Sequence, residues 1–179
     1  TLSVGYEYQE SNTEDPTWGG LPTWNSDGSK THYDRSQTVA PKWAYSDKDN
    51  TRIFANLTQR FDNGWEAHIN GMHADTNFDS KLMYMSGYPD QATGAGMVGY
   101  GGWNKGERKQ DAVDAFLRGG FDLFGRQHEM MFGGSFSRQR NHYDNRMPDA
   151  LYGMIDVGNF KNWNGDIADP QWTPWKLYS

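Results

Sequence analysis

The segment that most constrains the fold is residues 112–139, where apolar and polar side chains alternate along two arms joined by a tight turn. One side of the two arms carries the apolar set Val113, Ala115, Leu117, Gly119, Phe121, Leu123, Met130, Phe132, Gly134 and Phe136, interrupted by His128. A period of two is that of a β-strand with one apolar and one polar face. We place the turn at Gly125-Arg126-Gln127. Each arm of about 11–12 residues exceeds the usual globular strand and approaches the roughly 9–11 residues with which a tilted strand crosses a bilayer.

The same alternation predicts three further strands, at residues 1–9, 51–61 and from Trp65 to about residue 84. Asp62-Asn63-Gly64 is a strong signal for a tight hairpin turn between the last two. Irregular loops rich in Gly, Pro, Asn, Asp, Ser and Thr are predicted at residues 11–50, at 85–110 and from about 141 to the end.

Long and short connections therefore alternate strictly along the chain. In an antiparallel meander this order places the short turns at one end of the strands and the long loops at the other, as in outer-membrane barrels. Phe61, Trp65, Phe121 and Phe124 lie near the short turns, where such barrels carry an aromatic girdle. The pattern predicts an all-β fold, an antiparallel meander of about five long strands from a transmembrane β-barrel with long extracellular loops.

Composition excludes several other classes. Mean hydropathy is −0.94 and 35% of residues are hydrophobic, and no apolar run approaches the roughly 18 residues of a membrane-spanning helix. The net charge of −6 argues against nucleic acid as a partner, because no basic patch neutralises phosphates. The sequence contains no cysteine, so disulfides, thiolate metal sites and a cysteine nucleophile are ruled out.

No catalytic constellation emerges from the titratable residues. His128 and Glu129 are adjacent in a strand and face opposite ways, and the same holds for His68 and His73. The segment 25–29 resembles part of a calcium loop but lacks the remaining spaced ligands, so turn chemistry explains it better. We expect no enzyme activity, no metal site and no cofactor.

The tryptophans gather in the predicted loops. Seven of the 8 tryptophans lie there: Trp18, Trp24, Trp43, Trp103, Trp163, Trp172 and Trp175. Loop tryptophans beside glycine and proline form rigid aromatic surfaces that suit partly apolar, hydrogen-bonding ligands such as sugars or siderophores. The alternative is that long loops fold over themselves and use these rings as internal plugs.

Several motifs in a fixed order resemble a known family. They are Leu2–Gln9, Pro16–Pro22, Trp43–Lys48, Phe78–Lys81, Phe124–His128 and Phe132–Ser135. Over residues 1 to about 140 they look like TonB-dependent ferric-siderophore receptors. The resemblance is strongest to the receptor for the hydroxamate chelates ferric coprogen and ferric rhodotorulic acid, and the motifs are also similar to the pyoverdine and ferrioxamine receptors. After about residue 140 the resemblance is looser.

The resemblance implies a bacterial outer-membrane barrel of about 22 strands, plugged by an N-terminal domain, that imports ferric chelates. Residues 1–179 would then be part of the barrel domain, without the plug and the remaining strands. An arc of this kind has two unpaired edges, so we expect the isolated piece neither to fold stably nor to transport.

The resemblance also implies partners and a binding site. The partners would be a ferric hydroxamate siderophore, outer-membrane lipid, and the energy-coupling TonB complex acting through the missing plug, with no nucleic acid. Aromatic residues in the outer loops and upper wall contact the chelate in this family. On that analogy the ligand-binding residues are Trp18, Trp24, Tyr84 and Trp103, with Trp43 behind them.

Two alternatives from other classes remain open from the residues alone. A soluble carbohydrate-binding module would use the loop tryptophans for stacking on sugar rings, but it would have to bury the apolar strand face under a second sheet, and no strands are left for that. A glycan-processing enzyme would need two carboxylates facing each other across a cleft, and no such pair is singled out.

Overall fold

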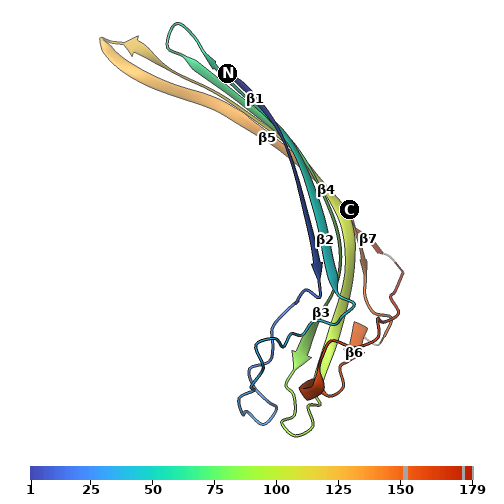
Figure 1. Cartoon of the computed structure of the whole chain (residues 1–179). Coiled ribbons are helices and arrows are strands. Elements are labelled where there is room, and N and C mark those ends of the chain that lie inside the picture. Colours follow the sequence, from blue (N-terminus) through green and yellow to red (C-terminus); the bar gives the residue numbers. More distant parts are fainter. Residues whose placement is uncertain (151–152, 175, 179) are drawn as a thin grey trace. The chain divides into compact units, whose positions relative to one another are not determined.

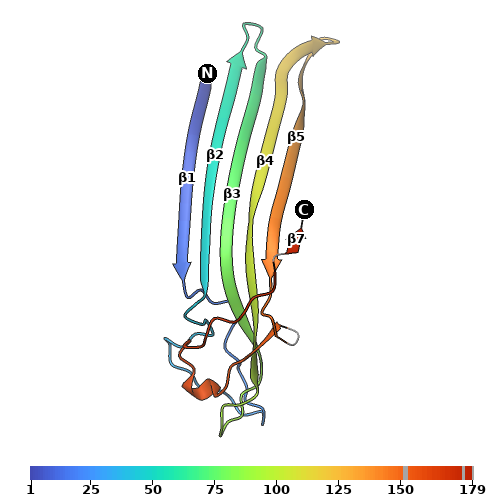
Figure 2. The same ribbon diagram turned by 90° about the vertical axis from the view of Figure 1, so that its right-hand side faces the viewer.

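The computed structural model describes residues 1–150, 153–174 and 176–178, and its main feature is an antiparallel sheet of long strands (Figure 1). The long strands are β1 (Leu2–Glu14), β2 (Tyr45–Arg60), β3 (Glu66–Gly87), β4 (Met97–Leu123) and β5 (Arg126–Arg146). Figure 2 shows them side by side in chain order. The all-β fold with five long strands is therefore confirmed, while the number of strands in a closed barrel stays a prediction.

Three short elements follow the long strands: β6 (Met154–Asp156), the 3-10 helix η2 (Phe160–Asn162) and β7 (Lys176–Tyr178). β6 pairs with β4 at Val98–Tyr100, and β7 pairs with β5 at Tyr143–Asn145. The chain after β5 thus returns to the sheet at two places.

The first tight turn lies where the sequence predicts it, and the second is displaced by one residue. At the first, the Phe61 amide donates to the Trp65 carbonyl at 2.8 Å, and Gly64 adopts a φ of 81°. At the second, Phe124 and Gly125 have φ values of 51° and 74°, as the two central residues of a type I′ turn require. The second turn is therefore Phe124-Gly125, one residue earlier than predicted, with Arg126 already in β5.

The predicted loop at 85–110 is wrong for most of its length. The connection between β3 and β4 covers only residues 88–96, and the glycine-rich stretch after it belongs to β4. Glycine is needed there for close approach: a Cβ on Gly99 would lie 2.6 Å from the Met83 sulfur, and one on Gly101 would lie 2.8 Å from the Pro148 ring. The predicted start of the irregular tail near 141 is also too early, because β5 continues to Arg146.

The described chain divides into two compact units, and the long strands contribute residues to both. Unit 1 comprises residues 1–10, 49–77 and 107–141, and unit 2 comprises residues 11–48, 78–106 and 142–179. No helix in the described residues is long and apolar enough to cross a membrane.

Unit 1 has an exposed apolar face and a polar face. The exposed side chains of the apolar face are Leu2, Val4, Tyr6, Tyr8, Ile53, Leu57, Phe61, Ile69, Val113, Leu123, Met130, Phe132 and Phe136. On the polar face Asn70 donates to Asp114 at 2.7 Å, and Arg118 donates to Glu66 at 3.1 Å. No second sheet in the described part of the chain covers the apolar face.

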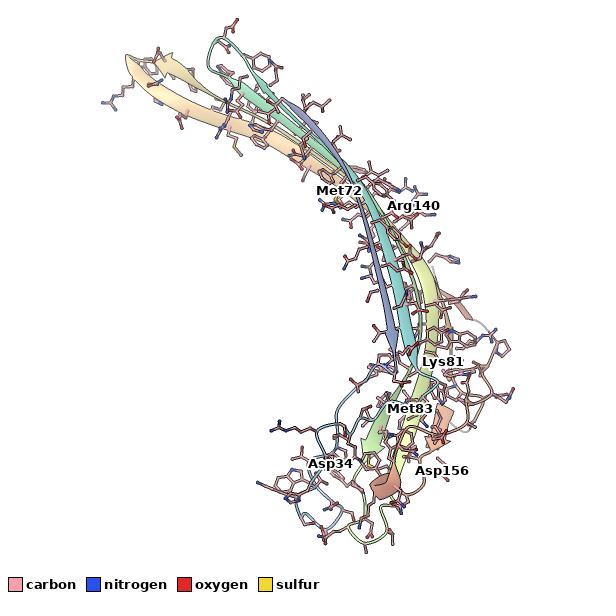
Figure 3. The ribbon with its side chains drawn as sticks, in the orientation of Figure 1. Asp34, Met72, Lys81, Met83, Arg140 and Asp156 are labelled. Carbon is pink, nitrogen blue, oxygen red and sulfur yellow. The ribbon has the colours of Figure 1, made fainter. Side chains whose placement is uncertain are left out.

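Unit 2 holds the hydrophobic core of the described residues. Val39, Met97, Val157 and Phe160 form it, from the loop after β1, the start of β4 and the segment after β6. Met83 is fully buried beside Lys81 along β3 (Figure 3). The loops of unit 2 therefore fold into a packed structure and fix the aromatic residues that the sequence singles out.

Candidate functional site

The first aromatic surface of unit 2 joins a loop to two strands. The Trp18 ring meets Tyr84 edge-on at 5.1 Å, and Tyr84 stacks on Tyr100 at 5.1 Å with an interplanar angle of 16°. Trp18 is 41% exposed and Tyr84 is 38% exposed, so these rings present area to a ligand. We call Trp18, Tyr84 and Tyr100 the aromatic ladder.

Gly19 lets the ladder assemble through its backbone conformation. A Cβ on Gly19 would make only ordinary contact with the Tyr84 Cβ, at 3.5 Å. Gly19 has a φ of 107°, a backbone conformation that side chains strongly disfavour. The Trp18-Gly19-Gly20 segment thereby turns the indole onto the strand.

The second aromatic surface encloses a lysine. The Lys81 ammonium lies 4.5 Å from the centroid of a Trp103 ring, 5.5 Å from Trp172 and 5.9 Å from Tyr45. Its charge is balanced by Asp169, whose Oδ2 is 2.7 Å away. The Lys81 side chain is only 11% exposed, and a buried ammonium is stable when it is paired and lies over aromatic faces. We call Lys81, Tyr45, Trp103, Asp169 and Trp172 the lysine cage.

Two carboxylates hold the rings of the cage in place. Asp79 Oδ1 accepts from the Tyr45 hydroxyl and from the Trp103 indole N–H, both at 2.9 Å. Asp169 Oδ1 accepts from the Trp172 indole N–H at 2.8 Å. Burial raises the pKa of the Tyr45 phenol, and the adjacent Asp79 carboxylate raises it further. The cage thus fixes the loop carrying Asp169 and Trp172 to β2, β3 and β4.

The remaining predicted residues lie at the margins of these surfaces. Trp43 meets Trp172 edge-on at 5.8 Å, so it extends the lysine cage. Trp24 is 44% exposed and forms a β-bridge with Lys30. The Lys30 ammonium lies 5.7 Å from the centroid of the Trp24 ring. Trp175 lies outside the described residues.

The structure therefore separates the five predicted residues into groups. Tyr84 and Lys81 are three apart along β3, and Tyr100 and Trp103 are three apart along β4, so the ladder and the cage lie on opposite faces of these strands. Trp18 and Tyr84 lie together, Trp43 and Trp103 lie together, and Trp24 is apart from both pairs.

Sequence reasoning missed Lys81, Asp169 and Tyr100. Alternation along β3 places Lys81 on the same face as Asp79 and Met83. This alternation is a weak indication in the sequence that Lys81 is paired or buried. Asp169 and Trp172 had none, because their partners are far away in the chain.

A polar cluster of unit 1 was also missed. Glu66 contacts the Arg118 guanidinium at 3.1 Å and His68 Nε2 at 2.5 Å, and His68 stacks on Phe116 at 4.4 Å. The spacing of two between Glu66 and His68 puts both on one face, which would have identified the pair.

The side chains of the aromatic ladder and the lysine cage can offer stacking faces and hydrogen-bonding groups to a ligand. The described residues contain no group of three or more His, Cys, Asp or Glu side chains placed to hold a metal ion. The calcium-like segment 25–29 is a turn in which Asp27 Oδ1 accepts from the Ser29 amide at 2.9 Å and from its hydroxyl at 2.6 Å.

Comparisons with known proteins give relatives of one kind. No protein-family model matches the chain. The ferric-pyoverdine BN7/BN8 receptor of Pseudomonas putida is 35% identical over 94% of this chain, which covers 21% of that receptor. The chain thus spans about a fifth of the length of the curated relatives it matches.

Solved structures agree with the sequence relatives. The receptor FpvA of Pseudomonas aeruginosa, bound to a heterologous iron-loaded pyoverdine, matches with a TM-score of 0.83 and 27% identity, over 98% of this chain and 23% of that one. The ferripyoverdine receptor of the outer membrane of P. aeruginosa, bound to ferripyoverdine, matches with a TM-score of 0.79, 27% identity and the same coverage. In sequence and in fold, this chain is therefore similar to a segment of the ferripyoverdine receptors.

Proposed function

We propose that this chain is part of the wall of an outer-membrane receptor that binds a ferric siderophore and takes it up. The observation that carries the proposal is the apolar face of unit 1, which is exposed along all five long strands. A soluble protein rarely leaves so large an apolar surface uncovered, whereas a barrel turns it toward lipid. The same observation disfavours the soluble carbohydrate-binding module.

The strand lengths support a membrane protein whose wall rises beyond the bilayer. β3 has 22 residues and β4 has 27, against the roughly 9–11 residues that cross the hydrocarbon core. Unit 1, with its apolar face and both tight turns, is our choice for the membrane-spanning part. Unit 2, with the long loops and the aromatic ladder, would then lie outside the membrane.

The ligand class follows from the relatives only as a proposal. The reported relatives are named for ferric pyoverdine, so ferric pyoverdine is the first ligand to test. A hydroxamate chelate of the coprogen type, which the sequence motifs favoured, is the second. The exposed rings Trp18 and Tyr84 would provide stacking area on one face of β3 and β4, and Trp24 would add a further ring. Trp103 and Trp43 would act from the lysine cage on the opposite face, so Trp103→Ala tests that face separately.

The remaining parts of the proposal concern location and energy. The protein would reside in the bacterial outer membrane, would catalyse no covalent step and would need no cofactor. Uptake would draw on energy supplied by the TonB complex.

The test is ligand affinity of the complete receptor with Trp18→Ala and Trp103→Ala, measured by calorimetry with ferric pyoverdine and with ferric coprogen. Losing a stacking ring should weaken binding about tenfold, as for other aromatic contact residues. Phe124→Ala is the control, because Phe124 is a 94% exposed aromatic in a tight turn of unit 1. Unchanged affinity in both tryptophan variants would contradict the site, and binding of neither chelate would contradict the function.

A further inference from the structure

A cavity in unit 2 is not used by the proposed site. Its volume is about 260 Å³, and its walls include Lys30, His32, Tyr33, Gln37, Phe160 and Lys161. None of the aromatic ladder residues lines it. The cavity is small and polar, of a size for one sugar or aromatic ring with a substituent.

The lining of this cavity is basic although the chain as a whole is acidic. Lys30, His32 and Lys161 line it and no carboxylate does, whereas the net charge of the protein is −6. The Lys161 ammonium donates to the Gln91 carbonyl at 2.9 Å, which engages one of its three N–H groups. A basic pocket in an acidic protein is complementary to an anionic ligand.

The Asp90 carboxylate, next in sequence to the lining residue Pro89, is hydrogen-bonded within its own turn. Asp90 Oδ1 accepts from the Ala92 amide at 3.0 Å, the Thr93 amide at 2.7 Å and the Thr93 hydroxyl at 2.9 Å. The Thr93 hydrogen bonds lower the pKa of Asp90, which keeps it ionised within its own turn. Asp90 therefore supports its own loop through these hydrogen bonds, and its attraction to Lys161 offsets only part of the positive charge of the wall.

The walls of the cavity are fixed by contacts between three loop segments. The Ser26 amide donates to the Pro89 carbonyl at 3.0 Å, and the Phe160 amide donates to the Gly94 carbonyl at 2.9 Å. Phe160 is 1% exposed in the core and meets Tyr33 edge-on at 6.0 Å. A site held in this way is formed before its ligand arrives, which reduces the entropy lost on binding.

Tyr33 adds an unused polar group to the wall. Its hydroxyl is buried and has no hydrogen-bond partner within the described residues. Buried hydroxyls normally have a hydrogen-bond partner. An unpaired hydroxyl in a cavity wall therefore indicates that a bound ligand supplies the missing partner after a small movement of the side chain.

We propose that this cavity binds an oxyanion, a carboxylate or a phosphate, carried on a sugar or aromatic ring. Lys30 and Lys161 hold the oxyanion, and Tyr33 and Phe160 border the ring. Two sources share this chemistry: an acidic substituent of a siderophore, and a phosphosugar of the outer-leaflet lipid. The two candidate sources rest on the proposed function, whereas the binding of an oxyanion on a ring does not, so the titration below tests it separately.

The test is a ligand-detected NMR titration of the complete protein in detergent with glucose 6-phosphate, glucose and inorganic phosphate. Glucose 6-phosphate should bind more tightly than either of the others, and Lys30→Gln/Lys161→Gln should weaken it about tenfold or more through loss of charge-assisted hydrogen bonds. Lys42→Gln is the control, since Lys42 pairs with Asp166 on an exposed surface and does not line the cavity. Equal affinity in the wild type and the double variant, or equal affinity for glucose, would overturn the proposal.

Competition then identifies the source. Displacement of bound glucose 6-phosphate by ferric pyoverdine supports a siderophore substituent, and displacement by the phosphorylated sugar backbone of the lipid supports the lipid. Displacement by neither would overturn the proposal.

Discussion

Lys81 shows how a single charged residue determines the course of a long loop. An ammonium that is 11% exposed loses hydration, which must be offset by Asp169 at 2.7 Å and by the faces of Trp103 and Trp172. Since Asp169 and Trp172 belong to the segment after β6, the loop is stable in place only while these contacts persist.

Lys81→Met should therefore release this loop. Methionine keeps much of the packing against the rings but removes the charge, leaving Asp169 without its cation. We expect the local opening free energy of residues 157–174 to fall by about 1–3 kcal/mol, which speeds tryptic cleavage after Lys161 roughly tenfold.

The matched control is Lys42→Met. Lys42 and Asp166 are 3.7 Å apart with side chains 59% and 71% exposed, so their pair contributes less than about 0.5 kcal/mol. Equal cleavage rates in the two variants would show that the lysine cage does not hold the loop.

The sequence singles out some of the aromatic residues of these surfaces, but not Tyr100 and not how the rings combine. Glycine and proline beside Trp18 and Trp24 correctly indicated rings in loops, and both are exposed. Alternation along β3 and β4 assigns each residue to a face, but it does not say which loop covers that face. The partners Asp169 and Trp172 come from the far end of the chain, where no local pattern points to them.

Among the strands, glycines opposite aromatic rings stand out in unit 1. A Cβ on Gly5 would collide with Phe54, one on Gly119 with Trp65 and one on Gly133 with Phe116. The Phe54 and Trp65 rings lie across the bare backbone of a neighbouring glycine, whereas Gly133 lies against the backbone and Cβ of Phe116. Both kinds of close approach pin the register of neighbouring strands.

Gly133 and Gly134 provide a matched test of this arrangement. A Cβ on Gly133 would lie 2.6 Å from Phe116 Cβ and would also clash with the Ala115 carbonyl, while a Cβ on Gly134 meets nothing within 4 Å. Gly133→Ala should lower the unfolding free energy of the complete receptor by about 1–3 kcal/mol, and Gly134→Ala should change it by less than about 0.5 kcal/mol. Urea unfolding followed by tryptophan fluorescence would measure both, and equal midpoints would contradict the account.

The strands could be predicted where apolar and polar residues alternate without interruption. The residues at which the strands end could not be predicted. The segment 85–110 reads as a loop because glycine usually punctuates strands. Here Gly99 and Gly101 admit Met83 and Pro148 against β4, and such tertiary close approaches leave no mark in a local pattern.

On the scale of the whole molecule, the two units bury apolar surface differently. Unit 2 contains a core around Val39, Met97 and Phe160. Unit 1 leaves its apolar face exposed. β1 forms one edge of the described sheet, and at the other edge β5 pairs only with the three-residue strand β7. Such a face and such edges are stable when lipid covers the face and further strands pair with the edges.

The central claim, that the apolar face of unit 1 contacts lipid, can be tested with single cysteines because the sequence contains none. Val113→Cys and Leu117→Cys place a fluorescent label on the apolar side of β4, and Asp114→Cys and Arg118→Cys place it on the polar side. In the complete protein in vesicles, brominated lipid should quench the label strongly at 113 and 117 and weakly at 114 and 118. Equal quenching at all four positions, or quenching at 113 and 117 by a water-soluble agent alone, would contradict a membrane-facing wall.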